Sequence, residues 1–390
     1  MISVEEALNR VLSLVSPLDI ENIPLIEAAG RTLAKNVVAT RNQPPFSASA
    51  MDGYAVIGDE VEADAMFKVI GESAAGQGYA GVVKAGQTVR IFTGAPVPEG
   101  ATRVVIQEDV KRSGDVITIK RDPDEKAHTR PEGADFKIGD KIDAPRRLTA
   151  SDIALLASMN IASVPVYRRP VVALLATGDE LVMPGETPGP DQIIASNSFG
   201  LKAMLDAAGA ETRMLPIARD TIASLEAAFS LAEGADLIVT IGGASVGDHD
   251  LVGAVAEKLG MEQSFYKVAM RPGKPLMAGR VMGIPMIGLP GNPVSSMVCG
   301  QIFILPALAV MTGHDPAPLP RSTAKLAAPL PPNGPREHYM RARLQGGTVE
   351  PFGKQDSALL TVLASANVLV VRAPNDPARE VGSAVDIIPI

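Results

Sequence analysis

The spacing of hydrophobic residues changes along the chain and predicts several kinds of structure in succession. In the first 15 residues, apolar positions at helical spacing predict an amphipathic helix, with Ser3 and Glu6 as its capping box. From residue 46 to residue 147, short alternating runs such as FKVIGES and RVVIQEDV lie between glycine and proline turns and predict β-strands. One further helix is expected in LTASDIALLASMNI, capped by Thr149 or Ser151.

A different period begins near residue 168. The apolar runs VVALLA (171–176) and DLIVTI (236–241) predict buried strands, and helical segments alternate with them up to residue 315. Alternating strands and helices predict a parallel sheet covered on both faces, and SFYKVA is expected as one of its strands. Asn292 and Pro293 predict the cap and first residue of the last helix. Beyond a proline-rich linker, short strands return and predict a small β-barrel or sandwich.

Composition narrows the classes of function. The chain has a net charge of −8, which argues against a broad nucleic-acid interface. Cys299 is the only cysteine, so no intrachain disulfide is expected and a cytoplasmic location is predicted. The four histidines are scattered, without the spacing of a zinc site. Residues 281–313 lack charge but contain four prolines, which predicts a buried strand, turn and helix rather than a membrane span.

Two loops that follow predicted buried strands are candidates for ligand binding. The first carries Glu180 within TGDEL, and the second, GGASVGDHD, carries adjacent glycines followed by Asp248 and Asp250. In α/β sheets, ligands bind outside the carboxyl ends of the strands, and glycine lets the backbone approach them closely. The alternative is a tight turn whose aspartates cap the next helix. Neither a Walker A loop nor a G-x-G-x-x-G fingerprint is present.

Three further stretches contain candidate polar groups. FYKVAMRPGKP concentrates Lys267, Arg271 and Lys274 between prolines, which indicates an anion site or, alternatively, a solvated basic turn. In the loop PPFSASAMDGYAV, Asp52 is the one ionisable side chain before the predicted strand. Turn-like segments farther along carry Thr93 and Asp135. Taken singly, each of the latter segments is an ordinary turn.

Taken together and in order, these stretches resemble one enzyme family. SAMDGYAV, TGAPVP, TGDEL, GGASVGDHD, RPGKP and LPGNPVS are similar to motifs of the molybdopterin molybdenumtransferases, which include the bacterial MoeA proteins and the E domain of gephyrin. The resemblance implies a multidomain α/β plus β fold. Its parts are a linking segment (1–45 and 138–167), an inserted β domain (46–137), a three-layer α/β molybdopterin-binding domain (168–315) and a C-terminal β-barrel (316–390).

The same resemblance implies a reaction. The family inserts molybdate into adenylylated molybdopterin, releases AMP and requires Mg²⁺, in a homodimer whose site lies near the subunit interface. The residues implied as catalytic are Asp52, Thr93, Asp135, Glu180, Asp220, Asp250, Lys267, Arg271 and Lys274. Those implied in substrate binding are Gly242, Gly243, Ser245, Gly247, Pro290, Asn292, Pro293, Arg341 and Ser357. The metal ligands would be Asp220, Asp248 and Asp250. Many family members have Lys at the position of Arg271, so the contact that this residue makes stays open.

The resemblance also implies partners. A molybdopterin adenylyltransferase would supply the substrate, and molybdoenzymes or carrier proteins would accept the product; neither nucleic acid nor a membrane is expected. Two other functions remain open. One is the preceding adenylyl transfer, because that enzyme shares the α/β domain and a similar glycine loop. The other is a scaffold protein that retains the fold.

Overall fold

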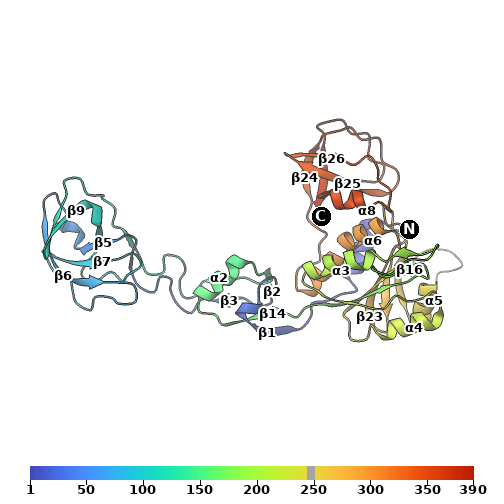
Figure 1. Cartoon of the computed structure of the whole chain (residues 1–390), viewed down its shortest axis with the longest axis horizontal. Coiled ribbons are helices and arrows are strands. Elements are labelled where there is room, and N and C mark those ends of the chain that lie inside the picture. Colours follow the sequence, from blue (N-terminus) through green and yellow to red (C-terminus); the bar gives the residue numbers. More distant parts are fainter. Residues whose placement is uncertain (244–250) are drawn as a thin grey trace. The chain divides into compact units, whose positions relative to one another are not determined.

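The computed structural model describes residues 1–243 and 251–390 (Figure 1). By its internal contacts the chain divides into two compact units. One consists of Met1–Glu21, Gly30–Ala34 and Pro165–Ile390. The other consists of Asn22–Ala29 and Lys35–Val164. Each unit is described in turn.

The unit that contains residues 35–164 is mostly β-structure, as its alternating pattern predicts. Its principal sheet has six strands in the order β8-β5-β7-β6-β10-β9. These strands are β5 (Gly53–Val56), β6 (Met66–Ser73), β7 (Gln87–Ile91), β8 (Arg103–Ile106), β9 (Val110–Ser113) and β10 (Val116–Ile119). Tyr54, Phe67, Val105 and Ile117 form a core against one face of this sheet. Two short ribbons pair β3 (Val37–Val38) with β12 (Lys141–Ile142) and β4 (Ala48–Ser49) with β11 (Thr129–Arg130).

The predicted helix near residue 150 is confirmed. Helix α2 (Ala150–Ser158) begins with a capping box, because the Thr149 side chain accepts a hydrogen bond from the Asp152 backbone while the Asp152 carboxylate accepts from Thr149. Arg146 lies 2.6 Å from the same carboxylate. A four-stranded sheet in the order β1-β14-β2-β13 comes from β1 (Ile20–Pro24), β2 (Thr32–Leu33), β13 (Arg146–Arg147) and β14 (Ser163–Tyr167).

The other unit holds a six-stranded sheet in the order β18-β15-β19-β23-β22-β20. Its strands are β15 (Val171–Ala176), β18 (Glu211–Met214), β19 (Leu237–Ile241), β20 (Glu262–Tyr266), β22 (Met277–Val281) and β23 (Ile284–Leu289). The first four in spatial order are parallel. SFYKVA does form a strand of the sheet, β20, but β22 runs antiparallel to both of its neighbours, β23 and β20, so the prediction of a wholly parallel sheet was wrong. The reason is the two-residue Met282–Gly283 turn, with both φ values positive, which connects only antiparallel strands.

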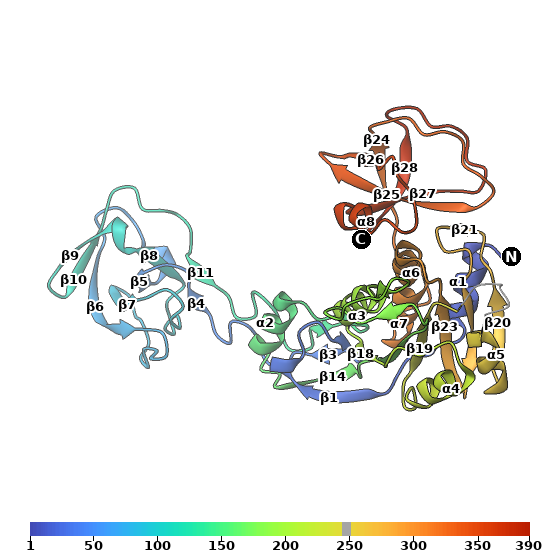
Figure 2. The ribbon, with the colours of Figure 1, turned by 45° about the vertical axis from the view of Figure 1, so that its right-hand side comes forward.

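Helices cover both faces of this sheet, as predicted (Figure 2). Val172 and Leu174 face a core that contains α1 (Val4–Leu12), α3 (Asn197–Ala207), α6 (Pro293–Cys299) and α7 (Leu305–Met311). Ala173 and Leu175 face the opposite core, which contains α4 (Ile222–Ser230) and α5 (Leu251–Lys258). Because consecutive strand residues point to opposite faces, one uninterrupted apolar run supplies both cores.

The uncharged stretch near residue 300 is a core helix. A π-helical turn, Gly300–Ile304, joins α6 to α7, so that helical structure runs from Pro293 to Met311. This segment is long and apolar enough to cross a membrane, but 78% of its apolar window is buried inside the structure. That burial identifies it as the core element that its prolines and glycines predict.

The C-terminal strands close into a barrel. β24 (Ser322–Leu326), β25 (Glu337–Gln345), β26 (Thr348–Pro351), β27 (Val368–Arg372) and β28 (Ala384–Pro389) pair in the order β25-β26-β24-β28-β27. Pairing of β25 with β27 closes the ring. The short strand β21 (Met270–Arg271) adds to β25 in parallel, and α8 (Leu360–Ser365) lies between the barrel and α6 (Figure 1). β21 therefore links the segment RPGKP directly to the barrel.

Candidate active site

A cavity of about 750 Å³ lies where β15, β19 and β23 end. Its wall is built from the loops that follow these strands, which is where α/β sheets bind ligands. The lining residues are Ala176, Thr177, Gly178, Glu180, Leu181, Ile193, Ile194, Ala195, Ser196, Asn197, Ser198, Asp220, Ile241, Gly242, Gly243, Pro275, Pro290, Gly291, Asn292, Pro293 and Ala358. Seven of the predicted site residues are therefore brought to one cavity: Glu180, Asp220, Gly242, Gly243, Pro290, Asn292 and Pro293.

Glycine is required at the turn after β19 because the backbone there passes close to its neighbours. Gly243 has φ +64°, and a Cβ atom at this position would lie 2.2 Å from Val252 Cγ2. Gly242, with φ +90°, would place a Cβ atom 2.9 Å from the Thr177 carbonyl oxygen. The loop therefore presents backbone rather than side chains to the cavity. The predicted approach of this backbone to a ligand stays a prediction.

Two carboxylates stand on the cavity wall. Glu180 follows β15 and Asp220 follows the segment after β18, and both side chains are exposed. Their loops are tied together, because Arg219 Nη1 donates to the Asp179 carbonyl oxygen at 2.9 Å and the Asp220 backbone N–H donates to Asp179 Oδ1 at 3.3 Å. This places two carboxylates at the ends of neighbouring strands, and neither forms an ion pair with a cation in residues 1–243 or 251–390. Such oxygen ligands suit a hard cation.

The predicted residues Ser245, Gly247, Asp248 and Asp250 lie outside the described residues. Within residues 1–243 and 251–390, no group of three or more His, Cys, Asp or Glu side chains is arranged to hold a metal ion. Two carboxylates are nevertheless a common protein contribution to Mg²⁺ binding, because substrate phosphates and water supply the remaining ligands. Glu180 and Asp220 therefore fit such an ion.

The predicted cations do not line the cavity themselves. Arg271 and Lys274 are exposed on the segment that runs from β21 to β22, and Pro275, directly after Lys274, does line it. Lys267 is half-buried, with Nζ 5.0 Å from the centre of the Tyr266 ring. The loop is held by backbone bonds from Val268 N–H and Leu276 N–H to the Lys274 carbonyl oxygen. The segment thus brings its cations beside the cavity wall without placing them on it.

Arg341 is the largest fully buried side chain among the described residues. Its Nη2 donates to the Asp356 carbonyl oxygen at 2.8 Å, whereas Nε and Nη1 are buried without a hydrogen-bond partner in the part of the chain that the structure describes. Burial lowers the pKa of Arg341, and the nearby Arg271 lowers it further. A buried guanidinium with two free donors is prepared to bind an anion.

His338 stands between two arginines on the barrel. It pairs with Arg271 of β21 on one side and with Arg372 of β27 on the other. Only 7% of the residue is exposed, and Nε2 has no hydrogen-bond partner among the described residues. Burial, followed by the positive charge of Arg271, lowers the pKa of His338 to about 4. The imidazole is therefore neutral at physiological pH.

The loop after β23 joins the α/β sheet to the barrel. Asn292 caps α6 and Pro293 is its first residue, as predicted, although the Asn292 side chain makes no capping bond. The Val294 backbone N–H donates to the Ser357 carbonyl oxygen at 3.0 Å, and Ala358 lines the cavity. Ser357 thus lies at the edge of the cavity, while Arg341, beneath the same 352–358 loop, is absent from its wall.

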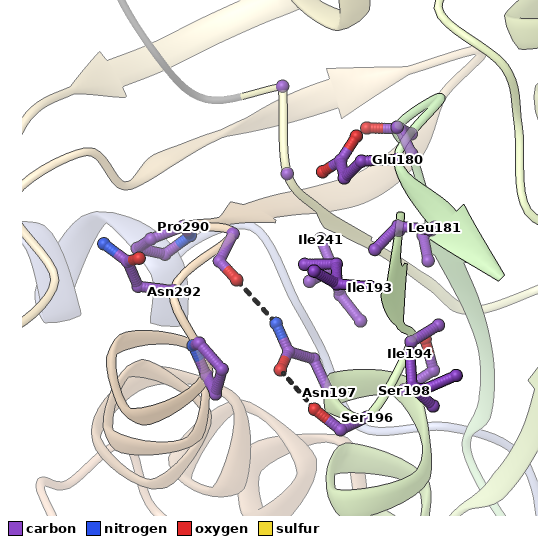
Figure 3. Close-up of a pocket in the computed structure, with 18 of the residues that line it drawn as sticks. Glu180, Leu181, Ile193, Ile194, Ser196, Asn197, Ser198, Ile241, Pro290 and Asn292 are labelled. Atoms are coloured by element: carbon purple, nitrogen blue, oxygen red, sulfur yellow. Dashed lines mark hydrogen bonds between the residues drawn. The ribbon is translucent and has the colours of Figure 1, made fainter. Parts of the chain in front are cut away.

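Sequence reasoning missed one group of polar cavity residues. Ser196, Asn197 and Ser198 line the wall at the start of α3 (Figure 3). The signal was present, because serine and asparagine directly before an apolar helical run mark a helix start. The sequence does not show that the N-terminus of this helix faces the cavity, because its orientation depends on tertiary packing.

The other predicted residues lie in the unit that contains residues 35–164. Asp52 Oδ1 accepts hydrogen bonds from both the backbone N–H and the hydroxyl of Thr93, each at 2.8 Å. These bonds, the backbone bond first, lower the pKa of Asp52. Asp135 is exposed, and its backbone N–H donates to the Gln43 carbonyl oxygen at 2.9 Å. Two of the three predicted residues, Asp52 and Thr93, are thus brought into direct contact.

A strand-end cavity with carboxylates, backbone-rich loops and nearby cations is the arrangement of an enzyme that acts on an anionic ligand. Comparison with known proteins defines the family. Residues 2–160 match the MoeA N-terminal region (domain I and II), residues 173–310 match a probable molybdopterin binding domain, and residues 323–390 match the MoeA C-terminal region (domain IV).

Individual relatives support the same family assignment. The molybdopterin molybdenumtransferase of Haemophilus influenzae is 38% identical over 318 residues, which cover 80% of this chain and 78% of the relative. Molybdopterin molybdenumtransferase 2 of Mycobacterium tuberculosis is 36% identical over 385 residues and 95% of each chain. The molybdopterin biosynthesis MoeA protein of Pyrococcus horikoshii OT3 superimposes with a TM-score of 0.84 at 26% identity, covering 100% of both chains. The chain belongs to the molybdopterin molybdenumtransferase family, whose members are enzymes of molybdenum cofactor biosynthesis.

Proposed function

We propose that this enzyme inserts molybdate into adenylylated molybdopterin and releases AMP in a reaction that depends on Mg²⁺. The observation that carries the proposal is the cavity at the ends of β15, β19 and β23. All but one of its lining residues fall within the stretch that matches a molybdopterin-binding domain, the exception being Ala358. A cavity of about 750 Å³ is large enough for a ligand of nucleotide size.

Glu180 and Asp220 are the described residues that would hold the Mg²⁺, together with Asp248 and Asp250 from outside the described residues. When bound, Mg²⁺ neutralises charge that develops on phosphate oxygens as a phosphoanhydride breaks. The chain's own contribution is positional. The Arg219–Asp179 contact fixes the turn that carries Asp220, and Gly242 and Gly243 let backbone approach the substrate.

Molybdate is a tetrahedral dianion and needs donors that are not already paired. Arg341 supplies two such donors, Nε and Nη1, and the β21–β25 pairing brings Arg271 into the same part of the barrel. We add two residues to the proposed molybdate-binding set. Ser357 lies on the loop that contacts Arg341, and Lys274 lies on the segment between β21 and β22. Since water cannot compensate these buried donors, an anion that pairs with them is bound strongly.

We extend the proposal to the assembly. Asp52, Thr93 and Asp135 lie in the other compact unit, and we propose that they serve the same reaction in a homodimer. A molybdopterin adenylyltransferase would supply the substrate, and molybdoenzymes or carriers would receive the product. The single buried Cys299 suits the reducing cytoplasm in which we place the reaction.

The direct test is AMP release. Purified protein is mixed with adenylylated molybdopterin, molybdate and Mg²⁺, and AMP is measured by chromatography. We expect release that requires all three additions. AMP at the level of a buffer control would reject the proposal. Consumption of ATP with unmodified molybdopterin would instead indicate the preceding adenylyl transfer.

A further inference from the structure

We propose that the first turn of α3 is a phosphate-binding subsite of the cavity, in which the Ser198 hydroxyl and the free backbone N–H groups of the turn bind a phosphate monoester. This inference deepens the proposed function and rests on it, because it names the wall of the cavity that receives one anionic group of the substrate or product.

The helix begins with donors that have no partner in its own backbone. Helix α3 has 11 residues, and the Ser196 side chain makes no capping bond. The first intrahelical bond runs from the Gly200 N–H to the Ser196 carbonyl oxygen at 3.2 Å. The N–H groups of the three preceding residues, 197–199, therefore lack an intrahelical acceptor, and the helix dipole adds partial positive charge there. This is the environment in which proteins bind phosphate.

Ser198 is the second and independent observation. The residue is 6% exposed, and it lines the cavity. Its hydroxyl has no hydrogen-bond partner within residues 1–243 and 251–390. The Ser198 Oγ atom is not one of the fully buried polar atoms without a partner, so it is accessible from the cavity, where a ligand oxygen can accept its hydrogen bond. Hydroxyl and helix start therefore point to the same kind of ligand.

Asn197 holds this turn in place. Its Nδ2 donates to the Gly291 carbonyl oxygen at 2.7 Å, and the Ser196 hydroxyl donates to its Oδ1 at 3.4 Å (Figure 3). The start of α3 is thereby fixed against the 290–293 loop, which forms the adjacent wall. A subsite whose donors are already oriented binds without the cost of ordering them.

The wall of the cavity that carries Glu180 is negatively charged, whereas the start of α3 carries partial positive charge. Figure 3 shows Glu180 at one end of the view and Ser196, Asn197 and Ser198 at the other, with Ile193 and Ile241 between them. An anion without a metal is repelled by the Glu180 end and attracted by the α3 end. The cavity therefore gives a phosphorylated ligand a preferred direction.

The test uses charge at one position. Ser198→Asp adds an anion to the subsite, and Ser198→Asn adds a neutral group of the same shape. Because an acidic residue in the first helical turn favours the helix, Ser198→Asp retains the fold, which thermal unfolding checks. The second control is Ala203→Asp, which adds the same charge to α3 at an exposed position beyond the first turn that does not line the cavity.

Binding of AMP and of molybdopterin is measured by calorimetry for the full-length protein and each variant. We expect Ser198→Asp to weaken one of these phosphate monoesters at least about tenfold, Ser198→Asn, whose amide can still donate a hydrogen bond, to weaken it less, and Ala203→Asp to stay within about threefold. Loss of AMP binding assigns the subsite to the adenylate phosphate, and loss of molybdopterin binding assigns it to the pterin phosphate.

Three results would overturn the subsite: unchanged binding of both probes by Ser198→Asp, an equal loss in Ser198→Asn, or an equal loss in Ala203→Asp. Failure of the proposed function looks different. In that case the wild-type protein releases no AMP from the complete mixture, although it binds the phosphate probes and loses them in Ser198→Asp.

Discussion

At the scale of single residues, the most informative side chains are those whose polar atoms are buried and unpartnered. Among the described residues these include Arg341 and His338, both on β25. Arg341 keeps two donors free beside a loop that reaches the cavity, and His338 remains neutral between two arginines. Such groups lower the stability of the folded protein, because a buried donor without a partner has lost its hydrogen bonds to water. Their presence is explained by a ligand or by the charge of their neighbours.

His338 makes a prediction about pH. Its pKa in the folded protein is about 4, whereas an unfolded histidine titrates near pH 6.5. As the pH falls from about 6.5 to 4, the unfolded chain gains a proton that the folded chain does not, so stability is lost in this window. Wild type is expected to lose up to about 3 kcal/mol more than His338→Gln between these pH values. Denaturant unfolding at pH 7, 5.5 and 4 measures the difference, and parallel curves for the two proteins would contradict it.

At the scale of elements, the turn after β15 shows how backbone geometry positions a carboxylate. Gly178 has φ +146°, and a Cβ atom there would lie 2.3 Å from Glu180 Oε2. The Glu180 side chain therefore occupies the space that a larger residue at position 178 requires. The identity of one residue in the turn decides where the acid stands in the cavity.

Gly178→Ala is therefore expected to displace Glu180 and lower the rate of AMP release at least about tenfold. The matched control is Gly185→Ala, because Gly185 also has a positive φ, +96°, but has nothing within 4 Å of the added Cβ. Both variants should lose about 1 kcal/mol of stability from backbone strain. Equal rates in the two variants, at equal stability, would show that the position of Glu180 is unimportant.

At the scale of the whole molecule, the predicted site residues fall in two compact units. Asp220 and the cavity belong to the unit that contains residues 165–390, and Asp52 and Thr93 belong to the other. The proposed homodimer allows a second copy of the chain to supply the missing set. Dimers that combine two different variants can test whether the two sets of residues come from different copies.

Asp52→Ala and Asp220→Ala are each expected to abolish AMP release, since each removes one charge from the proposed site. If the two sets act across the dimer, mixing the variants under exchanging conditions yields about a quarter of intact sites, because half the dimers are mixed and each has one intact site. Recovery of AMP release measures this. Mixtures as inactive as the separate variants, with exchange verified by mass, would place both sets in one copy.

Elements whose signal is local are predicted correctly from the sequence. The apolar runs at 171–176 and 236–241 became β15 and β19, and Thr149 capped α2, because burial and capping depend on nearest neighbours in the chain. The order of motifs also predicted the family, which the comparisons confirm, and through it pointed to Glu180, Asp220 and the glycine pair, which line the cavity. Local information failed at β22, because the Met282–Gly283 turn between β22 and β23 makes these two strands antiparallel.

Which polar groups share a cavity depends on how distant elements pack against one another. Glu180 lies in the turn after β15 and Ser198 in the first turn of α3, and packing against the Gly291 loop brings the start of α3 to the same cavity. Packing also buried Arg341 while leaving two of its donors free, and it placed Arg271 beside His338 through a strand pairing that joins distant segments. The physical reason is that burial and pairing arise between elements, so no window of the sequence contains them.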